Sequence, residues 1–394
     1  MKDELLLAQY DRAVGYAPYG GADAGECSST AARIRGTDLD SWHDEWLATA
    51  ERRYAAAEES IAAGDREGAR DAFLRAANYF RTAGLFAMTA PIDSRLMSSH
   101  AREVASFRRA AELMDPPAQI LEIPYEGTTL PGYLFRPADD DEPRPTMILT
   151  NGYDGTAEEL YFTSGAAALA RGWNVLTFDG PGQGAMIIDR GMPFRPDWEN
   201  VITPVVHHAL GFATVDPERI VLMGLSFGGY LAPRAATTEH RLAACISDCG
   251  PYDLYDVAAT RLPGPLAAQL PDGNAMALRL LDRLVRMVMR RPTAGWAMRR
   301  NLLVHGVADP LDFFRLAPEY SLKGREADIE CPTLVCSAED DDLSANAGRL
   351  YDALTCIKEQ VVFRAADGAG AHCESGARLQ FNETVFAWLG RVLP

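Results

Sequence analysis

The sequence predicts an α/β fold with a mostly parallel central sheet, a helical N-terminal domain and a helical insertion before the penultimate strand. In the second half of the chain, short apolar runs alternate with helical stretches, which is typical of buried parallel strands joined by helices. In the first part, apolar residues recur at helical spacing instead. One late segment interrupts the alternation without a strand-like run, as a helical insertion would.

The length and composition narrow the class of protein. The chain has 394 residues, enough for roughly two or three domains. Its 38 lysines and arginines against 55 aspartates and glutamates give a net charge of -17, which argues against nucleic acids and anionic membrane surfaces as partners. With 47% hydrophobic and 24% charged residues, the composition is that of a globular protein and excludes disorder and fibres.

The cysteines and the N-terminus indicate a cytoplasmic protein. The seven cysteines form no C-x-x-C pair and lie at no zinc-finger spacing, so we expect reduced thiols. The first residues have acidic neighbours and no signal-peptide pattern, and no window approaches the length of a membrane span. His207 and His208 lack a partner ligand at helical spacing, so we expect no metal and no cofactor. The sequence leaves a homodimer open.

A helical domain and a second domain divide the chain near residue 116. From about residue 42 to 88 the helical pattern breaks once, at Gly64-Asp65, as between two antiparallel helices. No second copy follows at a 34-residue period, so a solenoid is not predicted. After residues 114–117 (MDPP) the pattern alternates around Glu126-Gly127, as in a β-hairpin. We therefore expect a helical cap domain at 1–115 and an α/β domain at 116–394.

The α/β domain contains six further strand-like runs. They lie at residues 146–150, 173–178, 219–225, 242–248, 332–338 and 360–365. The interrupting segment, about 252–325, is rich in leucine, methionine and arginine. A helical lid over a pocket would fit there.

The motif GLSFGG at 224–229 is the strongest chemical signal. It places G-x-S-x-G between an apolar run and a helix-forming stretch, the context of a nucleophile on a sharp strand-to-helix turn. Gly224 and Gly228 leave room around Ser226, whose hydroxyl is raised at the helix N-terminus. The backbone N–H of Phe227 would then be an oxyanion donor.

An activated serine needs a base and a carboxylate that orients the base, and in this arrangement the acid precedes the histidine along the chain. His372 lies in a glycine-rich loop after the last strand-like run. The interval between Asp341 and His372 has room for one helix and one strand. The alternatives to Asp341 are its neighbours Asp340 and Asp342, and Asp309, which would leave one strand unexplained.

The loop NGYDGTAEE after residues 146–150 should supply the second oxyanion donor, from Tyr153 or Asp154. The carboxyl group of Asp154 has no use in an esterase, whereas a C–C hydrolase could use it to hold a carbonyl or phenol in its reactive form. The alternative is a turn residue in an Asp-Gly pair. The stretch FDGPGQG at 178–184 lacks the spacing and the lysine of a phosphate loop, so we expect it to be structural.

Aromatic side chains in the cap domain could line a pocket for an aromatic or polyketide ligand. The candidates are Trp42, Trp46, Tyr79, Phe80 and Arg81. The alternative is that aromatics at this spacing are ordinary helical core.

Together these stretches resemble the FrsA-like group of α/β hydrolases, which contains bacterial 2,6-dihydroxypseudooxynicotine hydrolase and fungal hydrolases that shorten polyketide chains. The matching stretches are SWHDEWLATAERRY, RAANYFRTA, NGYDGTAEE, FDGPGQG, RPDWE, GLSFGGYLAPRAA, PTLVCSAEDD and GAGAHC. The resemblance implies the α/β-hydrolase fold and a triad of Ser226, Asp341 and His372. It also implies that Asp154 occupies the place of a functional glutamate, one methylene longer.

The function expected from sequence is cofactor-independent serine hydrolysis of an aryl or polyketide carbonyl, by retro-Claisen C–C cleavage. The alternatives are a carboxylesterase, a thioesterase or an acyl-transferring cyclase of secondary metabolism. A non-catalytic ligand-binding protein is the alternative from another class.

Overall fold

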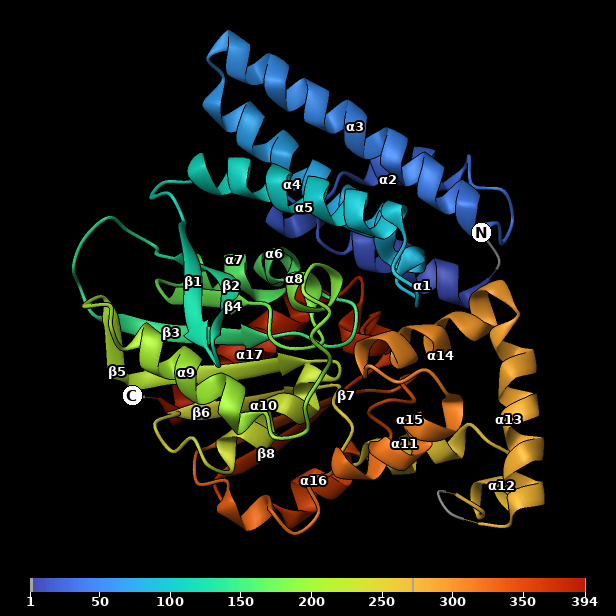
Figure 1. Cartoon of the computed structure of the whole chain (residues 1–394). Coiled ribbons are helices and arrows are strands. Elements are labelled where there is room, and N and C mark those ends of the chain that lie inside the picture. Colours follow the sequence, from blue (N-terminus) through green and yellow to red (C-terminus); the bar gives the residue numbers. More distant parts are fainter. Residues whose placement is uncertain (1–2, 271–272, 394) are drawn as a thin grey trace.

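The computed structural model describes residues 3–270 and 273–393, and Figure 1 shows the arrangement of its parts. A twisted sheet lies at the centre with helices around it. The N-terminal helices pack together on one side of it, and a second group of helices, inserted late in the chain, lies at one end (Figure 1).

The N-terminal helices each begin after an aspartate. They are α1 (Glu4–Val14), α2 (Ala24–Ala31), α3 (Leu39–Ala63), α4 (Arg66–Gly84) and α5 (Ser94–Glu112). Asp3, Asp23, Asp38, Asp65 and Asp93 accept hydrogen bonds from the first free backbone N–H groups, which stabilises a helix start. The predicted break at Gly64-Asp65 is confirmed, because Gly64 ends α3 with a φ of 77°.

Within the described residues the sheet has eight strands in the order β1-β2-β4-β3-β5-β6-β7-β8. They are β1 (Gln119–Tyr125), β2 (Thr128–Phe135), β3 (Arg144–Thr150), β4 (Asn174–Phe178), β5 (Val215–Leu225), β6 (Ala244–Asp248), β7 (Thr333–Ala338) and β8 (Lys358–Phe363). The hairpin β1–β2 joins β4 in antiparallel fashion, and every other pairing is parallel. The predicted mostly parallel sheet is confirmed.

Helices cover both faces of the sheet. They include α6 (Ala157–Leu160), α7 (Ala166–Leu169), α8 (Gly184–Ile188), α9 (Glu199–Ala209), α10 (Gly228–Ala236), α16 (Ala347–Ala353) and α17 (Arg378–Val392). Along β3, Ile148 belongs to the core beneath α9, whereas Met147 and Leu149 belong to the core beneath α17. Successive side chains of a strand point to opposite faces, so this strand is apolar throughout.

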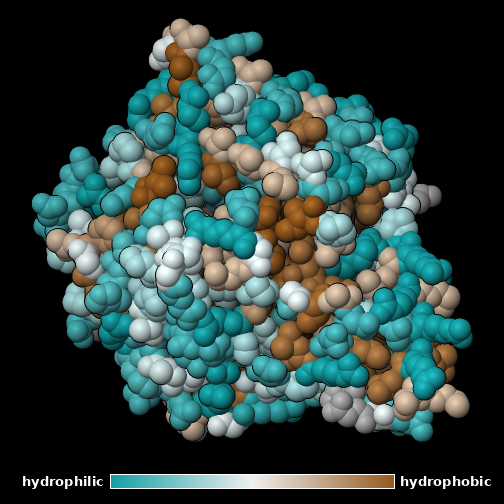
Figure 2. Space-filling model, viewed as in Figure 1, coloured by the Kyte–Doolittle hydropathy of each residue, from teal (hydrophilic) through white to brown (hydrophobic). Residues whose placement is uncertain are grey.

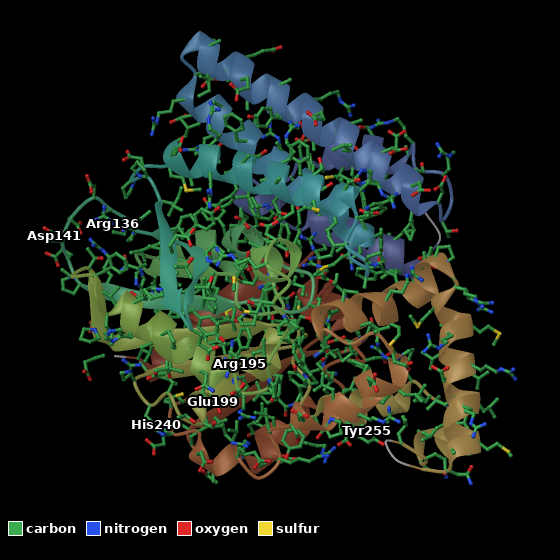
Figure 3. The ribbon with its side chains drawn as sticks, viewed as in Figure 1. Arg136, Asp141, Arg195, Glu199, His240 and Tyr255 are labelled. Carbon is green, nitrogen blue, oxygen red and sulfur yellow. The ribbon has the colours of Figure 1, made fainter. Side chains whose placement is uncertain are left out.

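Ion pairs stabilise the start of α9 and the segment that precedes it. Glu199, the first residue of α9, pairs with Arg234 of α10 at 2.9 Å, and Arg195 in the preceding segment pairs with Asp197 at 2.7 Å. Figure 3 labels Arg195 and Glu199 at this junction. The stretch RPDWE thus has a structural use close to α10.

The helical insertion lies between β6 and β7. It contains α11 (Leu254–Thr260), α12 (Gly264–Ala267), α13 (Ala275–Met289), α14 (Pro292–Val304) and α15 (Pro310–Leu316). Apolar side chains gather on the surface between this insertion and the N-terminal helices (Figure 2). The apolar residues Leu302 to Val304, which precede Asp309, form the last turn of α14 and not a strand.

The FDGPGQG loop after β4 is tied into the fold. The carboxylate of Asp179 accepts hydrogen bonds from the backbone N–H groups of Ala157 and Ala185, at 2.8 and 2.9 Å. Gly182 has a φ of 84°, which favours glycine. Across the described ranges, none of the helices combines the length and the apolar composition that crossing a membrane would require.

Candidate active site

Ser226 lies on the sharp turn between β5 and α10, and only glycine fits at the positions two residues before and after it. Ser226 has a φ of 60°, a strained conformation for a residue with a side chain. A Cβ atom on Gly224 would lie 1.8 Å from the carbonyl oxygen of Gly228, and one on Gly228 would lie 2.5 Å from that of Thr150. The predicted strand-turn-helix context of the motif is therefore present.

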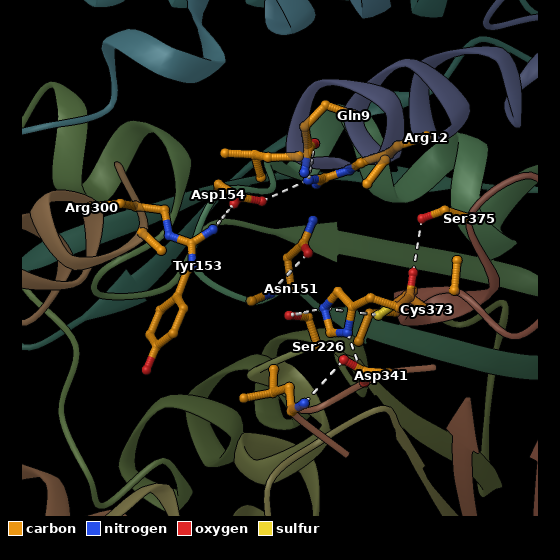
Figure 4. A pocket seen from close by; sticks show the side chains of 18 of the residues that line it. Gln9, Arg12, Asn151, Tyr153, Asp154, Ser226, Arg300, Asp341, Cys373 and Ser375 are labelled. Carbon is orange, nitrogen blue, oxygen red and sulfur yellow. Dashed lines mark hydrogen bonds and ion pairs between the residues drawn. The ribbon is translucent and has the colours of Figure 1, made fainter. Parts of the chain in front are cut away.

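Three side chains from three loops meet at this turn (Figure 4). The Nε2 atom of His372 lies 2.8 Å from the Oγ atom of Ser226. Its Nδ1 atom lies 2.9 Å from the Oδ2 atom of Asp341. This is the geometry of a nucleophile, a base and a carboxylate that orients the base.

Asp341 is held as an anion. Its carboxylate also accepts hydrogen bonds from the backbone N–H groups of Leu343 and Ser344, at 3.1 and 3.2 Å. Burial raises the pKa of Asp341. His372 and these hydrogen bonds have the larger, opposite effect and bring the pKa down to about 2. For His372, burial lowers the pKa, whereas Cys373 and Asp341 raise it above its ordinary value.

The other candidate aspartates lie elsewhere. Asp340 and Asp342 are exposed. Asp309 caps α15 by accepting a hydrogen bond from the N–H of Leu311, and it pairs with Arg286 at 2.6 Å. Neither arrangement brings a carboxylate to His372, so Asp341 is the one that the geometry selects.

The loop that follows β3 is pressed against the serine turn. A Cβ atom on Gly152 would lie 2.9 Å from both the backbone nitrogen of Phe227 and the Oγ atom of Ser226. The rings of Tyr153 and Phe227 stack with centroids 4.5 Å apart. Among the described residues, the backbone N–H groups of Tyr153, Asp154 and Phe227 donate to no protein acceptor, so they are available to an oxyanion.

A cavity of about 340 Å³ opens above Ser226 and His372. Three separate parts of the chain enclose it: helix α1, the loop after β3, and helices α11, α14 and α15 of the insertion. Besides the triad and this loop, the lining includes Leu5, Gln9, Arg12, Tyr16, Val257, Arg261, Trp296, Arg300 and Phe313. The cavity has the size expected of a small-molecule site.

Asp154 lies in the cavity wall between two arginines. Its carboxylate accepts a hydrogen bond from Arg12 at 2.7 Å and pairs on its other oxygen with Arg300. Burial raises the pKa of Asp154, but these cations outweigh burial and hold the pKa far below its usual range. An ionised carboxylate has no proton to give, so the geometry does not support Asp154 as a general acid toward the substrate.

The aromatic residues expected from the cap domain do not line this cavity, which corrects the expectation. Trp42, Trp46 and Tyr79 are fully buried in the core of the N-terminal helices. The Trp42 indole donates to the carbonyl of Thr82 at 2.8 Å. Apolar faces of packed helices bury one another first, and here α3 and α4 leave α1 facing the cavity.

Arg81 lies one layer behind the cavity. Its guanidinium pairs with Glu159 at 2.9 Å, and Glu159 in turn binds Arg12 at 2.6 Å. The hydroxyl of Tyr16 donates to the same carboxylate at 2.7 Å. Arg12 and Arg300 could not be predicted as site residues from the sequence, because their acidic partners lie more than a hundred positions away in the chain.

Two groups of cysteine and acidic side chains lie at or beside His372. The ligand atoms of Cys249, His372 and Cys373 all lie within 4.8 Å of one another, and those of Asp248, Cys249 and Glu374 form a second such group. The two thiols and the imidazole of the first group are the donors that a soft metal ion prefers, whereas the second group has two carboxylates. In the first of them the histidine nitrogen that faces Ser226 would be the ligand, so a metal there would compete with the triad.

Comparisons with known proteins match most of the chain. A profile of the alpha/beta hydrolase family matches residues 147–379, and one described as esterase FrsA-like matches residues 21–257. Hydrolase LUC6 of Fusarium sp is 36% identical, over 97% of this chain and 94% of that protein. The 20-hydroxy-prefusarin hydrolase FUS2 of Gibberella moniliformis is 35% identical, again over 97% and 94%.

Among solved structures, that of 2,6-dihydroxy-pseudo-oxynicotine hydrolase superposes with a TM-score of 0.76. It is 24% identical, and the match covers 96% of this chain and 95% of that one. The likeness extends over the N-terminal helices, the sheet and the insertion, and concerns the fold.

Proposed function

Because this chain belongs to the FrsA-like family of α/β hydrolases, we propose that it is a cofactor-independent serine hydrolase of secondary metabolism that cleaves a C–C bond beside a carbonyl. The substrate is an aryl or polyketide ketone. We propose further that residues 1–115 act as a cap and residues 252–325 as a lid, since α1 and α14 both reach the cavity.

The observation that carries this proposal is the line Ser226–His372–Asp341 at the floor of an enclosed cavity. His372 removes the proton of Ser226 as the oxygen attacks the carbonyl carbon. Asp341 holds the imidazole in the required orientation and stabilises its protonated form. The N–H groups of Phe227 and of Tyr153 or Asp154 bind the oxyanion.

Collapse of the tetrahedral adduct completes the first half-reaction. The bond between the carbonyl carbon and its α-carbon breaks, and the electron pair passes to the α-carbon, where a second carbonyl takes it up as an enolate. Protonated His372 is the group that returns the proton. Water, activated by the same imidazole, then hydrolyses the acyl-Ser226 ester to a carboxylate and free serine.

Two names among the similar proteins support hydrolysis of a small molecule. One relative is called a 20-hydroxy-prefusarin hydrolase, and the protein of the superposed fold is called a 2,6-dihydroxy-pseudo-oxynicotine hydrolase. Both names describe hydrolases of small natural products. Ester or thioester cleavage and acyl transfer use the same triad, so they are the outcomes against which the proposal is tested.

The test combines a serine-reactive probe with product analysis. A fluorophosphonate should label the wild type but not Ser226→Ala, and benzoylacetone should be split into a carboxylic acid and a ketone. Ser226→Ala and His372→Ala should each lower turnover by about a thousandfold to a millionfold, and the double variant should be little worse. Cleavage of p-nitrophenyl esters alone would identify an esterase. Absence of both labelling and turnover would favour a non-catalytic binding protein.

A further inference from the structure

The wall of the cavity carries more positive than negative charge. Arg12 and Arg300 in the wall, together with Arg81 one layer behind it, meet only two carboxylates, those of Asp154 and Glu159. Arg12 is saturated, because its guanidinium binds both carboxylates and the side-chain oxygen of Gln9. The unmatched positive charge therefore lies at arginines other than Arg12.

The guanidinium of Arg300 makes few hydrogen bonds. One of its terminal nitrogens binds Asp154, and the other lies 3.4 Å from the side-chain oxygen of Asn301. Its buried Nε atom has no hydrogen-bond partner within the described part of the chain. The guanidinium plane lies over the rings of Trp296 and Tyr153, at 4.6 and 5.1 Å. A ligand cannot reach the buried Nε atom, but each terminal nitrogen carries a second N–H that no described residue accepts, and an acceptor on a ligand would pair with it.

Arg261 adds a second free cation at the rim. It is the exposed residue at the end of α11 and lines the cavity. Among the described residues it has no hydrogen bond and no ion pair. The cavity thus holds a surplus of positive charge in a protein whose net charge is -17.

We propose that Arg300 and Arg261 form an anion subsite, which binds a negatively charged oxygen of the substrate while Ser226 attacks its carbonyl. The ligand class is a carboxylate or an enolate, because a guanidinium binds such oxygens through paired, charge-assisted hydrogen bonds. The reacting carbonyl rests on the proposed hydrolase function. Anion binding itself does not, and it can be measured without turnover.

The binding test uses octanoate and its neutral analogue octanamide, titrated by calorimetry into Ser226→Ala. Octanoate should bind about tenfold more tightly or better, as expected for a charge-assisted hydrogen bond. Arg300→Gln and Arg261→Gln, each added to Ser226→Ala, should abolish most of that preference and leave octanamide unchanged. Arg261 is exposed and unpaired, so its variant keeps the test decisive even where Arg300→Gln unfolds the protein. Arg283→Gln, exposed on α13 outside the cavity, is the matched control.

Kinetics on a cleaved diketone separate two sources of the anion. If the bound substrate already carries the charge, Arg261→Gln and Arg300→Gln should raise KM with little change in kcat. If the charge appears as the enolate forms, they should lower kcat with little change in KM. Equal binding of octanoate and octanamide to Ser226→Ala would overturn the subsite, as would an octanoate preference that survives both arginine variants. Failure of all turnover with a clear octanoate preference would reject the hydrolase function alone.

Discussion

The carboxylate of Asp341 accepts hydrogen bonds from two backbone amides as well as from His372. These amides fix its position, so the imidazole it orients is fixed too. The sequence left four aspartates open for this role. The choice between them needed the loop after β7 in three dimensions.

Asp341→Asn should lower turnover by roughly a thousandfold to ten-thousandfold, because an amide stabilises the wrong histidine tautomer and does not balance its charge. Asp309→Asn should be close to neutral, since that carboxylate caps α15 far from His372. Steady-state kinetics of the two purified variants decide the matter. An inactive Asp309→Asn beside an active Asp341→Asn would reject the assignment.

The carboxylate of Asp154 stabilises the fold through the buried arginines beside it. Asp154→Asn leaves Arg12 and Arg300 short of one negative charge, and breaking a buried pair costs about 3–5 kcal/mol. We therefore expect a loss of unfolding free energy on that order in urea denaturation, with turnover of ketone and ester substrates lowered together. Asp139→Asn, which removes an exposed partner of Arg136, should cost less than about 1 kcal/mol. Loss of ketone turnover alone, at full stability, would restore a direct chemical role.

Residues that act through local sequence could be predicted, and residues that act through distant partners could not. Ser226, Phe227 and His372 belong to short glycine-rich motifs whose spacing reflects a turn. Arg12 pairs with Asp154 across 142 positions, and no local pattern records such a pair. The prediction that aromatic residues of the cap line the pocket was wrong for a related reason. Aromatic residues recur at the same helical spacing whether they lie in a core or in a pocket.

At the scale of elements, buried strands were the best predicted. Residues of β3 and β4 are buried on both faces, and a parallel strand in that position needs a continuous apolar run. The run before Asp309 is equally apolar but belongs to helix α14. Short apolar runs fit a strand or a buried helix turn equally well, so packing decides between them.

The turn between β5 and α10 has no room for a side chain at its glycines. Gly224→Ala would place a Cβ atom 1.8 Å from a backbone oxygen, so we expect a loss of about 2–4 kcal/mol of unfolding free energy, as for overpacked sites, together with a loss of activity. Gly390→Ala on α17, where nothing lies within 4 Å, should instead gain about 0.5–1 kcal/mol. Thermal unfolding of both variants measures the difference. A stable and active Gly224→Ala would mean that the turn is more open than described.

For the whole molecule, a buried polar cluster joins α5 to the α/β part. The imidazole of His100 lies 3.6 Å from the carboxylate of Glu103 on the same helix and 3.7 Å from that of Asp189 after α8. Burial lowers the pKa of His100, but Glu103, Glu158 and Asp179 raise it more, to about 9. Burial and the charge of Glu158 raise the pKa of Asp179 to about 8.

Both shifts make the folded state bind more protons than the unfolded chain at neutral to alkaline pH, so its stability should decline as pH rises. The contribution of His100 is complete below its unfolded pKa of about 6.5 and is lost as pH rises through about 9. Asp179 acts in the same direction up to about pH 8. Each group can contribute a slope of up to about 1.4 kcal/mol per pH unit, measured as the urea unfolding free energy at a series of pH values.

His100→Asn should remove the contribution of that imidazole and make the slope between about pH 6.5 and 8 less steep than in the wild type. His207→Asn, a change of the same kind at an exposed position on α9, should leave the slope unaltered. A His100→Asn slope as steep as that of the wild type would mean that His100 is neutral in the folded protein. The junction between the N-terminal helices and the sheet would then depend on packing rather than on charge.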